Sequence, residues 1–324
     1  MLKRLCFVLA LVTLLFVPGC GGGGGNNLPP TDSHFTDLGT FGGTVAIARG
    51  MNDAGQVVGE YFANGTVRAF LWSATAGMQN IGTLGGDSVA FDINNAGQVV
   101  GASYNSSGAR AFLWTPAAGM RDLGSLGGLD SSAHAINDAG QVVGETSTGT
   151  GARRAFLWSE ATGMQSLGSG TYAAWDINNA GQVVGDAQFG SGYRHAFVWS
   201  PSTGIQDLGT IGGDNVSSAT AVNDLGEVVG YTLLRGTLTY HLAFRWTAST
   251  GMQDLGPLCG FTGSVNDINN HGQVLSDDSI WTPSTGEVQY IGTLNGEFIA
   301  AEAINNAGQV VGYSAAGHAF LWSP

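Results

Sequence analysis

The segment Ile93-Asn94-Asn95-Ala96-Gly97-Gln98-Val99-Val100-Gly101 decides the fold, because close copies of it recur along the chain. Seven segments carry the pattern Asn, Asn or Asp, any residue, Gly, Gln or Glu, Val. Successive copies lie 36 to 46 residues apart, which is typical of repeat architectures. Their turn glycines are Gly55, Gly97, Gly140, Gly181, Gly226, Gly272 and Gly308.

Each copy is followed by an aromatic run that ends in tryptophan, and six of the seven runs have the form Ala-Phe-x-Trp. A turn and a short segment that ends in Leu-Gly or Ile-Gly come next. One unit therefore predicts four short strands, which for the second copy lie at 88–93, 98–101, 110–114 and 120–123. Apolar residues on both sides of the pleat indicate sheets that are buried on both faces.

The Asn-Asn-Ala-Gly and Asn-Asp-Ala-Gly elements predict a tight turn between the first and second strands of each unit. Asn and Asp side chains cap their own backbone, and glycine adopts a positive φ without steric cost. A calcium-binding loop is the alternative, because oxygen-bearing side chains recur in this turn. Their spacing does not match an EF-hand loop, so we expect no metal site here.

The two ends of the repeat region predict how it closes. The first repeat-like piece, His34–Gly39, matches a fourth strand, whereas the last piece, His318–Trp322, matches a third strand. Pairing the two would complete a seventh unit and remove the free edges of a ring. We therefore predict an all-β fold over residues 34–324: a seven-bladed β-propeller of four-stranded antiparallel blades, closed by the N-terminal strand.

The repeated motifs also resemble a known family. His-Ala-Phe occurs at His195–Phe197 and His318–Phe320, beside repeated Ile-Asn-Asn-x-Gly-Gln-Val-Val-Gly and Asp-Leu-Gly-Thr-Leu-Gly-Gly elements. As a set they resemble the bacterial extracellular HAF repeat family, over about residues 34–324. The resemblance implies export and a repeat fold. It implies no established activity and no catalytic residues.

The N-terminus predicts export. Lys3 and Arg4 precede a 13-residue apolar stretch, 5–17, which is too short for an ordinary membrane-spanning helix. Val17-Pro18-Gly19-Cys20 resembles a bacterial lipobox, so we expect residues 1–20 to be a lipoprotein signal peptide and Cys20 to be lipidated. A plain secretory signal cut near Gly19 is the alternative. Residues 21–33 are predicted to be a Gly-rich flexible tether.

This arrangement places the protein at the cell envelope. We expect a lipid anchor at the bacterial outer membrane, an inference from the lipoprotein rule for the glycine that follows Cys20, or otherwise secretion. Cys259 is the one cysteine that a processed chain keeps besides Cys20, so no intramolecular disulfide is expected.

Composition excludes some partners. Beyond Lys3 and Arg4 the chain has nine arginines and no lysine, against 24 acidic residues. Nucleic acid requires a basic surface, so we expect no nucleic acid partner and no membrane contact except through the lipid anchor. No phosphate loop, zinc spacing or nucleophile elbow appears, so no cofactor and no catalytic residue is predicted. We expect a monomer.

The function predicted from these features is that of a binding or scaffold module for a protein or glycan ligand. The loops between second and third strands vary most among the repeats, and variable loops on a rigid scaffold commonly carry binding. Three aspartates follow the Gly-Gly elements, and three charged residues lie in the variable loops. These candidates for a ligand or cation face are Asp87, Asp130, Asp214, Arg235, Asp277 and Asp278. Loop capping is the alternative role for the first three.

Two other functions stay open: a propeller-type carbohydrate-active lyase or hydrolase, and a passive structural protein of the envelope. Asp92, Asp176 and Asp267 recur before the isoleucine that ends the first strand, and we interpret them as turn-associated polar groups. Glu160 and Trp175 break the local repeat pattern without an evident partner.

Overall fold

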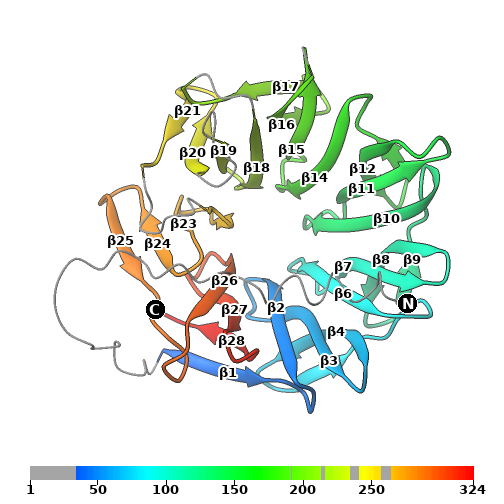
Figure 1. Cartoon of the computed structure of the whole chain (residues 1–324), viewed down its shortest axis with the longest axis vertical. Helices are drawn as coiled ribbons and strands as arrows, with labels where there is room; N and C mark the ends of the chain where they lie inside the picture. The colour runs from blue at the N-terminus through cyan, green and yellow to red at the C-terminus, as the bar shows by residue number, and fades with distance from the viewer. Residues whose placement is uncertain (1–33, 191, 213–215, 234–240, 257–263) are drawn as a thin grey trace.

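The computed structural model describes residues 34–190, 192–212, 216–233, 241–256 and 264–324. These residues form seven four-stranded antiparallel sheets, arranged as blades around a common axis (Figure 1). The chain is a seven-bladed β-propeller, as the repeats predict. No helix in the described part of the chain is long and apolar enough to cross a membrane.

The strands occupy four radial positions, from the axis outward (Figure 1). The innermost strands are β2 (Val45–Met51), β6 (Ser88–Ile93), β10 (Gly127–Ile136), β14 (Thr171–Ile177), β18 (Ser217–Val222), β22 (Asp267–Ile268) and β26 (Ile299–Ile304). The second strands are β3 (Val57–Ala63), β7 (Val99–Asn105), β11 (Val142–Thr148), β15 (Val183–Phe189), β19 (Val228–Leu233), β23 (Val274–Leu275) and β27 (Val310–Ser314).

The third strands are β4 (Thr66–Ser73), β8 (Gly108–Thr115), β12 (Arg153–Ser159), β16 (Tyr193–Ser200), β20 (His241–Thr247), β24 (Ser279–Thr282) and β28 (Ala319–Trp322). The outermost strands are β5 (Gly77–Asn80), β9 (Gly119–Asp122), β13 (Gly163–Ser166), β17 (Gly204–Gly209), β21 (Gly251–Asp254), β25 (Glu287–Tyr290) and β1 (Phe35–Gly39). We number the blades one to seven from the blade that contains β2 to the blade that contains β26.

The predicted closure of the ring is confirmed. Strand β1, from the start of the described chain, pairs antiparallel with β28 at its end, with Phe35 opposite Trp322. The Phe35 ring meets the Phe320 ring edge-on, with 5.2 Å between centroids. The backbone N–H of Ser323 donates to the carbonyl of His34. Blade seven is thus assembled from both ends of the propeller.

A glycine and a phenylalanine shape the core of six blades. The Ala-Phe-x-Trp phenylalanines are fully buried, and each lies opposite a glycine on the second strand, such as Phe112 opposite Gly101. A Cβ at Gly101 would lie 2.0 Å from the Val89 carbonyl oxygen and 2.9 Å from the Phe112 ring, so only glycine fits. Blade six has Ser276 and Ser279 at these two positions, with their hydroxyls 2.7 Å apart. The two positions change together: Ser279 is smaller than the phenylalanine of the other blades, and this leaves room for the side chain that Ser276 has in place of glycine.

The His-Ala-Phe motif has a structural role. The Nδ1 atom of His195 lies 3.0 Å from the carboxylate of Asp207, and that of His318 lies 2.9 Å from Asp37. The first pair joins β16 to β17, and the second joins the residue directly before β28 to β1. The histidine of this motif and the aspartate of the Asp-Leu-Gly element therefore contact each other. The His318–Asp37 pair joins the two ends of the propeller in blade seven.

The first asparagine of each turn binds neighbouring blades together. These turn asparagines are Asn52, Asn94, Asn137, Asn178, Asn223, Asn269 and Asn305. Each Nδ2 group donates to the backbone carbonyl of the turn asparagine in the next blade, at 2.9–3.3 Å, and the seventh bond returns to Asn52. Within its own turn, the Asn52 side-chain oxygen accepts from the N–H groups of Ala54 and Gln56. The predicted capping is confirmed, and it continues as a closed ring of hydrogen bonds.

Candidate functional site

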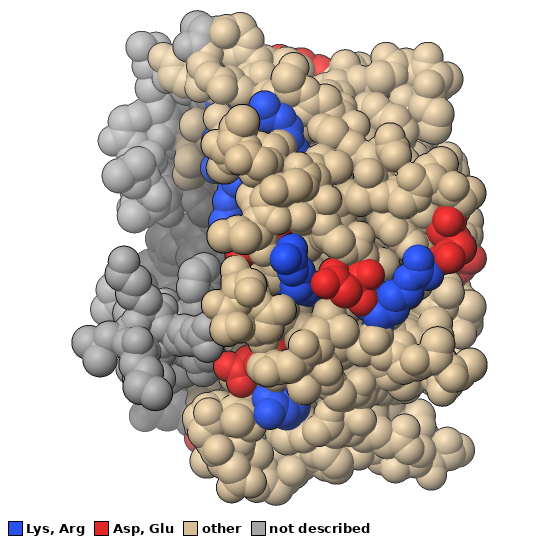
Figure 2. All heavy atoms as spheres, turned by 90° about the vertical axis from the view of Figure 1, so that its right-hand side faces the viewer, with Lys and Arg blue, Asp and Glu red and all other residues tan. Residues whose placement is uncertain are grey.

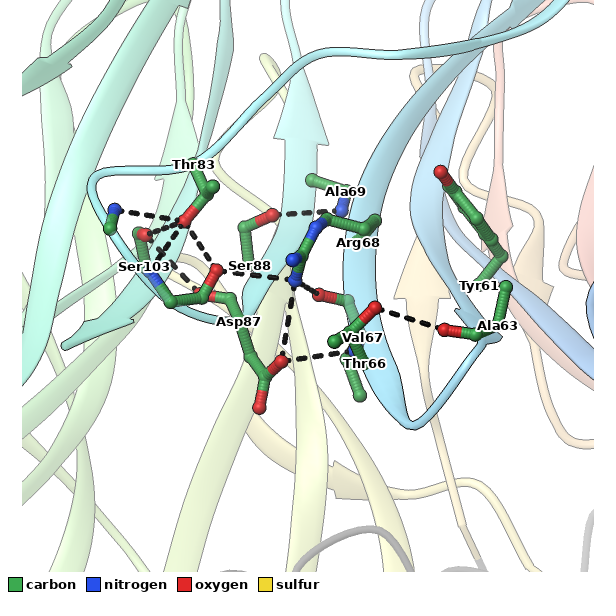
Figure 3. Close-up of polar contacts among 12 residues, drawn as sticks. Tyr61, Ala63, Thr66, Val67, Arg68, Ala69, Thr83, Asp87, Ser88 and Ser103 are labelled. Carbon is green, nitrogen blue, oxygen red and sulfur yellow. Dashed lines mark hydrogen bonds and ion pairs between the residues drawn. The ribbon is translucent and has the colours of Figure 1, made fainter.

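Asp87 and Asp130 cap strands of the preceding blade. The Oδ1 atom of Asp87 accepts from the Val67 N–H at 3.1 Å and lies 3.4 Å from Arg68 Nη1 (Figure 3). The Oδ1 atom of Asp130 accepts from the Ala109 N–H at 3.0 Å. For these two candidates the contacts match loop capping, the alternative that the sequence left open.

The other described candidates, Asp277 and Asp278, lie in the connection between the second and third strands of blade six. Asp277 accepts from the Ser264 hydroxyl at 2.7 Å and from Asn266 Nδ2 at 3.0 Å, so it is held within blade six. Burial, together with the charge of Asp277, raises the pKa of the adjacent Asp278. Asp214, Arg235 and Cys20 lie outside the described residues. Of the described candidates, Asp87 directly precedes β6 of blade two, Asp130 lies in β10 of blade three, and Asp277 and Asp278 belong to blade six.

Asp92, Asp176 and Asp267 differ from their predicted role as turn-associated groups. One carboxylate oxygen of each accepts from the next residue in its own strand, and the other accepts from the innermost strand of the following blade. Burial raises their pKa values to about 6, 7 and 6, respectively. They hydrogen-bond blade two to blade three, blade four to blade five, and blade six to blade seven. The sequence of a single repeat cannot reveal these contacts between blades.

The mouth of the propeller at the turn asparagines is polar, and its asparagine and aspartate side chains hydrogen-bond to one another. A depression of about 180 Å³ there is lined by turn residues of all seven blades. The second turn residues, Asp or Asn, form another closed ring in which Asp53, Asp138 and Asp224 each accept amide donors from both sides. The backbone N–H of Asn270 closes this ring by donating to Asn306 Oδ1 at 2.9 Å. The described residues hold no cluster of histidine, cysteine and acidic side chains fit for a metal ion.

The innermost strands carry one position that varies in every blade. It lies three residues before each turn asparagine, next to a buried position that is alanine in six blades and Val265 in the other. We call this set the axial ring: Arg49, Phe91, His134, Trp175, Thr220, Asn266 and Glu302. Seven different side chains at one equivalent position, amid repeated scaffold, break the symmetry of the propeller where the blades converge.

One side of the axial ring is ionic. Arg49 donates to both carboxylate oxygens of Glu60 and lies 3.6 Å from a carboxylate oxygen of Glu302, across the seam between blades one and seven. Burial raises the pKa of Glu302 to about 7, although Arg49 opposes the shift. Arg49 is thus engaged by two carboxylates.

The other side is aromatic. The His134 ring stacks on the Trp175 ring, with centroids 4.6 Å apart and planes at 10°, and Phe91 meets His134 edge-on at 6.0 Å. We call Phe91, His134 and Trp175 the aromatic platform. Trp175 does have a partner, because its Nε1 atom donates to Asp186 at 2.8 Å. Glu160 likewise pairs with Arg121, at 2.6 Å.

Sequence reasoning did not select the axial ring or the Arg194–Asp186 pair beside it. Arg194 lies one residue before the position that Arg68, Arg110 and Arg154 occupy in their blades, and the equivalent residue in its own blade is His195. The available signal was the alignment of the seven copies on their turn asparagines. That alignment shows that the position three residues before each turn asparagine varies in every copy, and that Trp175 occupies this position in blade four.

The outer wall carries mixed charge. Figure 2 shows basic and acidic side chains beside one another on one wall of the propeller, and most of that wall is uncharged. Two of the ion pairs on the second and third blades are Arg110–Asp122 and Arg121–Glu160. No continuous basic patch is visible on that wall.

The fold places the chain among the seven-bladed β-propellers. No family model matches the chain, and no curated protein matches it. Among solved structures it is similar to virginiamycin B lyase from Staphylococcus aureus, with a TM-score of 0.64, 10% identity, and 90% of this chain and 99% of that one covered. It is also similar to a puromycin hydrolase mutant, with a TM-score of 0.54 and 14% identity, over 88% of this chain and 52% of that one. At these identities the likeness shows the fold alone.

Proposed function

We propose that the protein is an exported binding module of the cell envelope, anchored through lipidated Cys20, and that it holds its ligand at the loop face. The loop face is the end of the propeller where second strands connect to third strands and one blade connects to the next. It is opposite the mouth formed by the turn asparagines. A protein or glycan partner on this surface is the function that the geometry supports best.

The distribution of exposed apolar side chains carries this proposal. Eight large apolar residues are exposed in the described part of the chain, and five belong to the loop face: Phe41, Tyr104, Leu129, Tyr193 and Phe298. Exposed apolar groups that gather on one face are typical of an interaction site. The opposite mouth has Leu225 alone among the eight. The axial ring adds non-repeated side chains, which a purely structural blade contact would not require.

A glycan and peptide array probed with residues 33–324 tests this function. We expect at least one ligand to bind, and the double variant Leu129→Ser, Tyr193→Ser to bind it at least about tenfold more weakly. Leu225→Ser is the matched control, since Leu225 is 70% exposed at the opposite mouth. Equal binding by all three proteins would exclude the loop face as the site. Turnover of a bound glycan would favour the carbohydrate-active alternative, and no binding at all the passive structural one.

A further inference from the structure

The aromatic platform presents an apolar surface beside the axis. Trp175 is 38% exposed although it lies in an innermost strand. The other seven tryptophans of the chain end the third-strand aromatic runs, so Trp175 is the one that does not belong to the repeat. Thr220 occupies the equivalent position in the next blade, which shows that the blade itself does not require a large ring there.

Three contacts hold the Trp175 ring in place. Its N–H donates to Asp186, whose side chain is fully buried. The second carboxylate oxygen of Asp186 accepts from Arg194 Nε at 2.7 Å. His134 stacks on the indole and is itself fixed by a 2.9 Å contact between its Nδ1 atom and the Ala174 carbonyl. The polar atom of the indole is satisfied internally, while part of its ring stays open to a ligand.

The groups beside Trp175 are suited to hydroxyl recognition. The Arg194 guanidinium lies over the Tyr172 ring, 4.9 Å from its centroid, and its side chain is 51% exposed. The Tyr172 hydroxyl donates to Gln188 Oε1 at 3.2 Å. These side chains supply N–H donors and oxygen acceptors next to an aromatic face. A pyranose ring matches this combination, since its C–H bonds stack on an aromatic ring and its hydroxyls both donate and accept.

The local charge favours a neutral ligand. Arg194 is paired with Asp186, and Arg153 is paired with Glu145 in the neighbouring blade. Both arginines thus already face a carboxylate, and an anionic ligand would have to compete for them. Burial lowers the pKa of His134, so this ring adds no positive charge at neutral pH. A sulfated or uronic acid polymer is therefore disfavoured.

We propose that Trp175 is the stacking residue of a site for a pyranose unit of a neutral glycan, with Arg194 and Tyr172 binding its hydroxyl groups. This inference rests on the proposed binding function and narrows it to one ligand class. The sugar lies against the open part of the indole, and the chain of Trp175, Asp186 and Arg194 keeps both the aromatic and the polar contacts in position before the ligand arrives.

Titration calorimetry and tryptophan fluorescence test the inference, with cellohexaose, maltohexaose, xylohexaose and N-acetylchitohexaose as probes of residues 33–324. We expect at least one probe to bind and to change the fluorescence. Trp175→Ala should weaken that binding at least about tenfold, whereas Trp175→Phe, which keeps an aromatic face, should stay within about threefold. Tyr290→Ala is the control, because Tyr290 is 60% exposed on an outermost strand. Thermal melting of each variant checks the fold.

The outcomes separate this inference from the function on which it rests. If no neutral oligosaccharide binds but a peptide on the array does, the binding function stands and the glycan site is refuted. If an oligosaccharide binds equally to the wild type and to folded Trp175→Ala, the glycan is bound elsewhere and the site is refuted. If neither class of probe binds, both proposals fail.

Discussion

Replacing Phe35 by alanine tests how the ring is closed. Phe35 lies in β1 opposite Trp322, is partly buried and packs against Phe320. In a ring that depends on this strand, the substitution should destabilise the whole propeller. In a propeller whose last blade is complete without β1, the same substitution would affect only a frayed N-terminus.

The expected magnitude follows from burial. Truncating a fully buried phenylalanine costs about 3–5 kcal/mol, and a partly buried one about half of that. The edge-on contact with Phe320 adds about 0.5–1.5 kcal/mol. We expect a loss of about 2–4 kcal/mol in the free energy of unfolding, which for a domain of this size lowers the melting temperature by about 3–7 °C.

Met120→Ala provides the matched comparison. Met120 lies opposite Trp114 in β9, as Phe35 lies opposite Trp322 in β1, and it is also partly buried. Denaturant and thermal unfolding of both variants, with the wild type beside them, should show comparable losses. Deletion of residues 34–39 should lower stability at least as much as Phe35→Ala. Closure through β1 is refuted if Met120→Ala is destabilised by about 2 kcal/mol while Phe35→Ala unfolds like the wild type.

Two further perturbations address the axis. Asn137→Ala removes the Nδ2 contacts to the Asn178 carbonyl and to Gln141, and it leaves the Gln141 N–H without its acceptor. We expect denaturant unfolding to show a loss of about 3 kcal/mol in the free energy of unfolding, whereas the control Ala139→Ser in the same turn should show no change. A loss below about 1 kcal/mol would contradict the ring of inter-blade hydrogen bonds. The pKa of Glu302 is about 7 in the folded protein and near 4 in the unfolded chain, so the folded state favours the protonated carboxyl group. The stability that this preference contributes is fully present below about pH 4 and is lost as the pH rises toward 7. Glu302→Gln should therefore reduce the fall in melting temperature between pH 5 and pH 8, and an unchanged pH profile would show that the pKa of Glu302 is not raised in the folded protein.

The identity of the fold could be derived from the sequence because its determinants are local and repeated. The turn asparagines with their glycines set the first hairpin of each blade, and the Ala-Phe-x-Trp runs set the third strand. The offset between His34–Gly39 and His318–Trp322 fixed the closing pair. Each of these signals depends on a few adjacent residues, and seven copies make the pattern unambiguous.

The candidate site required the tertiary structure. Asp87 and Asp130 were selected from their position after Gly-Gly elements, yet their carboxylates cap strands of the preceding blade. Asp92 binds a backbone N–H of the blade that follows it, 44 residues away. Whether such a side chain is a free ligand group or a structural tie depends on the neighbouring blade, and no repeat contains that information by itself.

The sequence by itself determined the number of blades, the order of strands in each blade and the strand that closes the ring. The strand order follows from turn and strand signals within each repeat, and the blade number and the closing strand follow from the count of repeats and from the offset between the two ends of the repeat region. Only the tertiary structure decided which side chains meet around the axis. Trp175, His134 and Phe91 come from three blades, and Asp186 and Arg194 come from the second and third strands of one of them. They act together because the propeller brings equivalent positions of neighbouring repeats into contact, and that contact is a property of the closed ring.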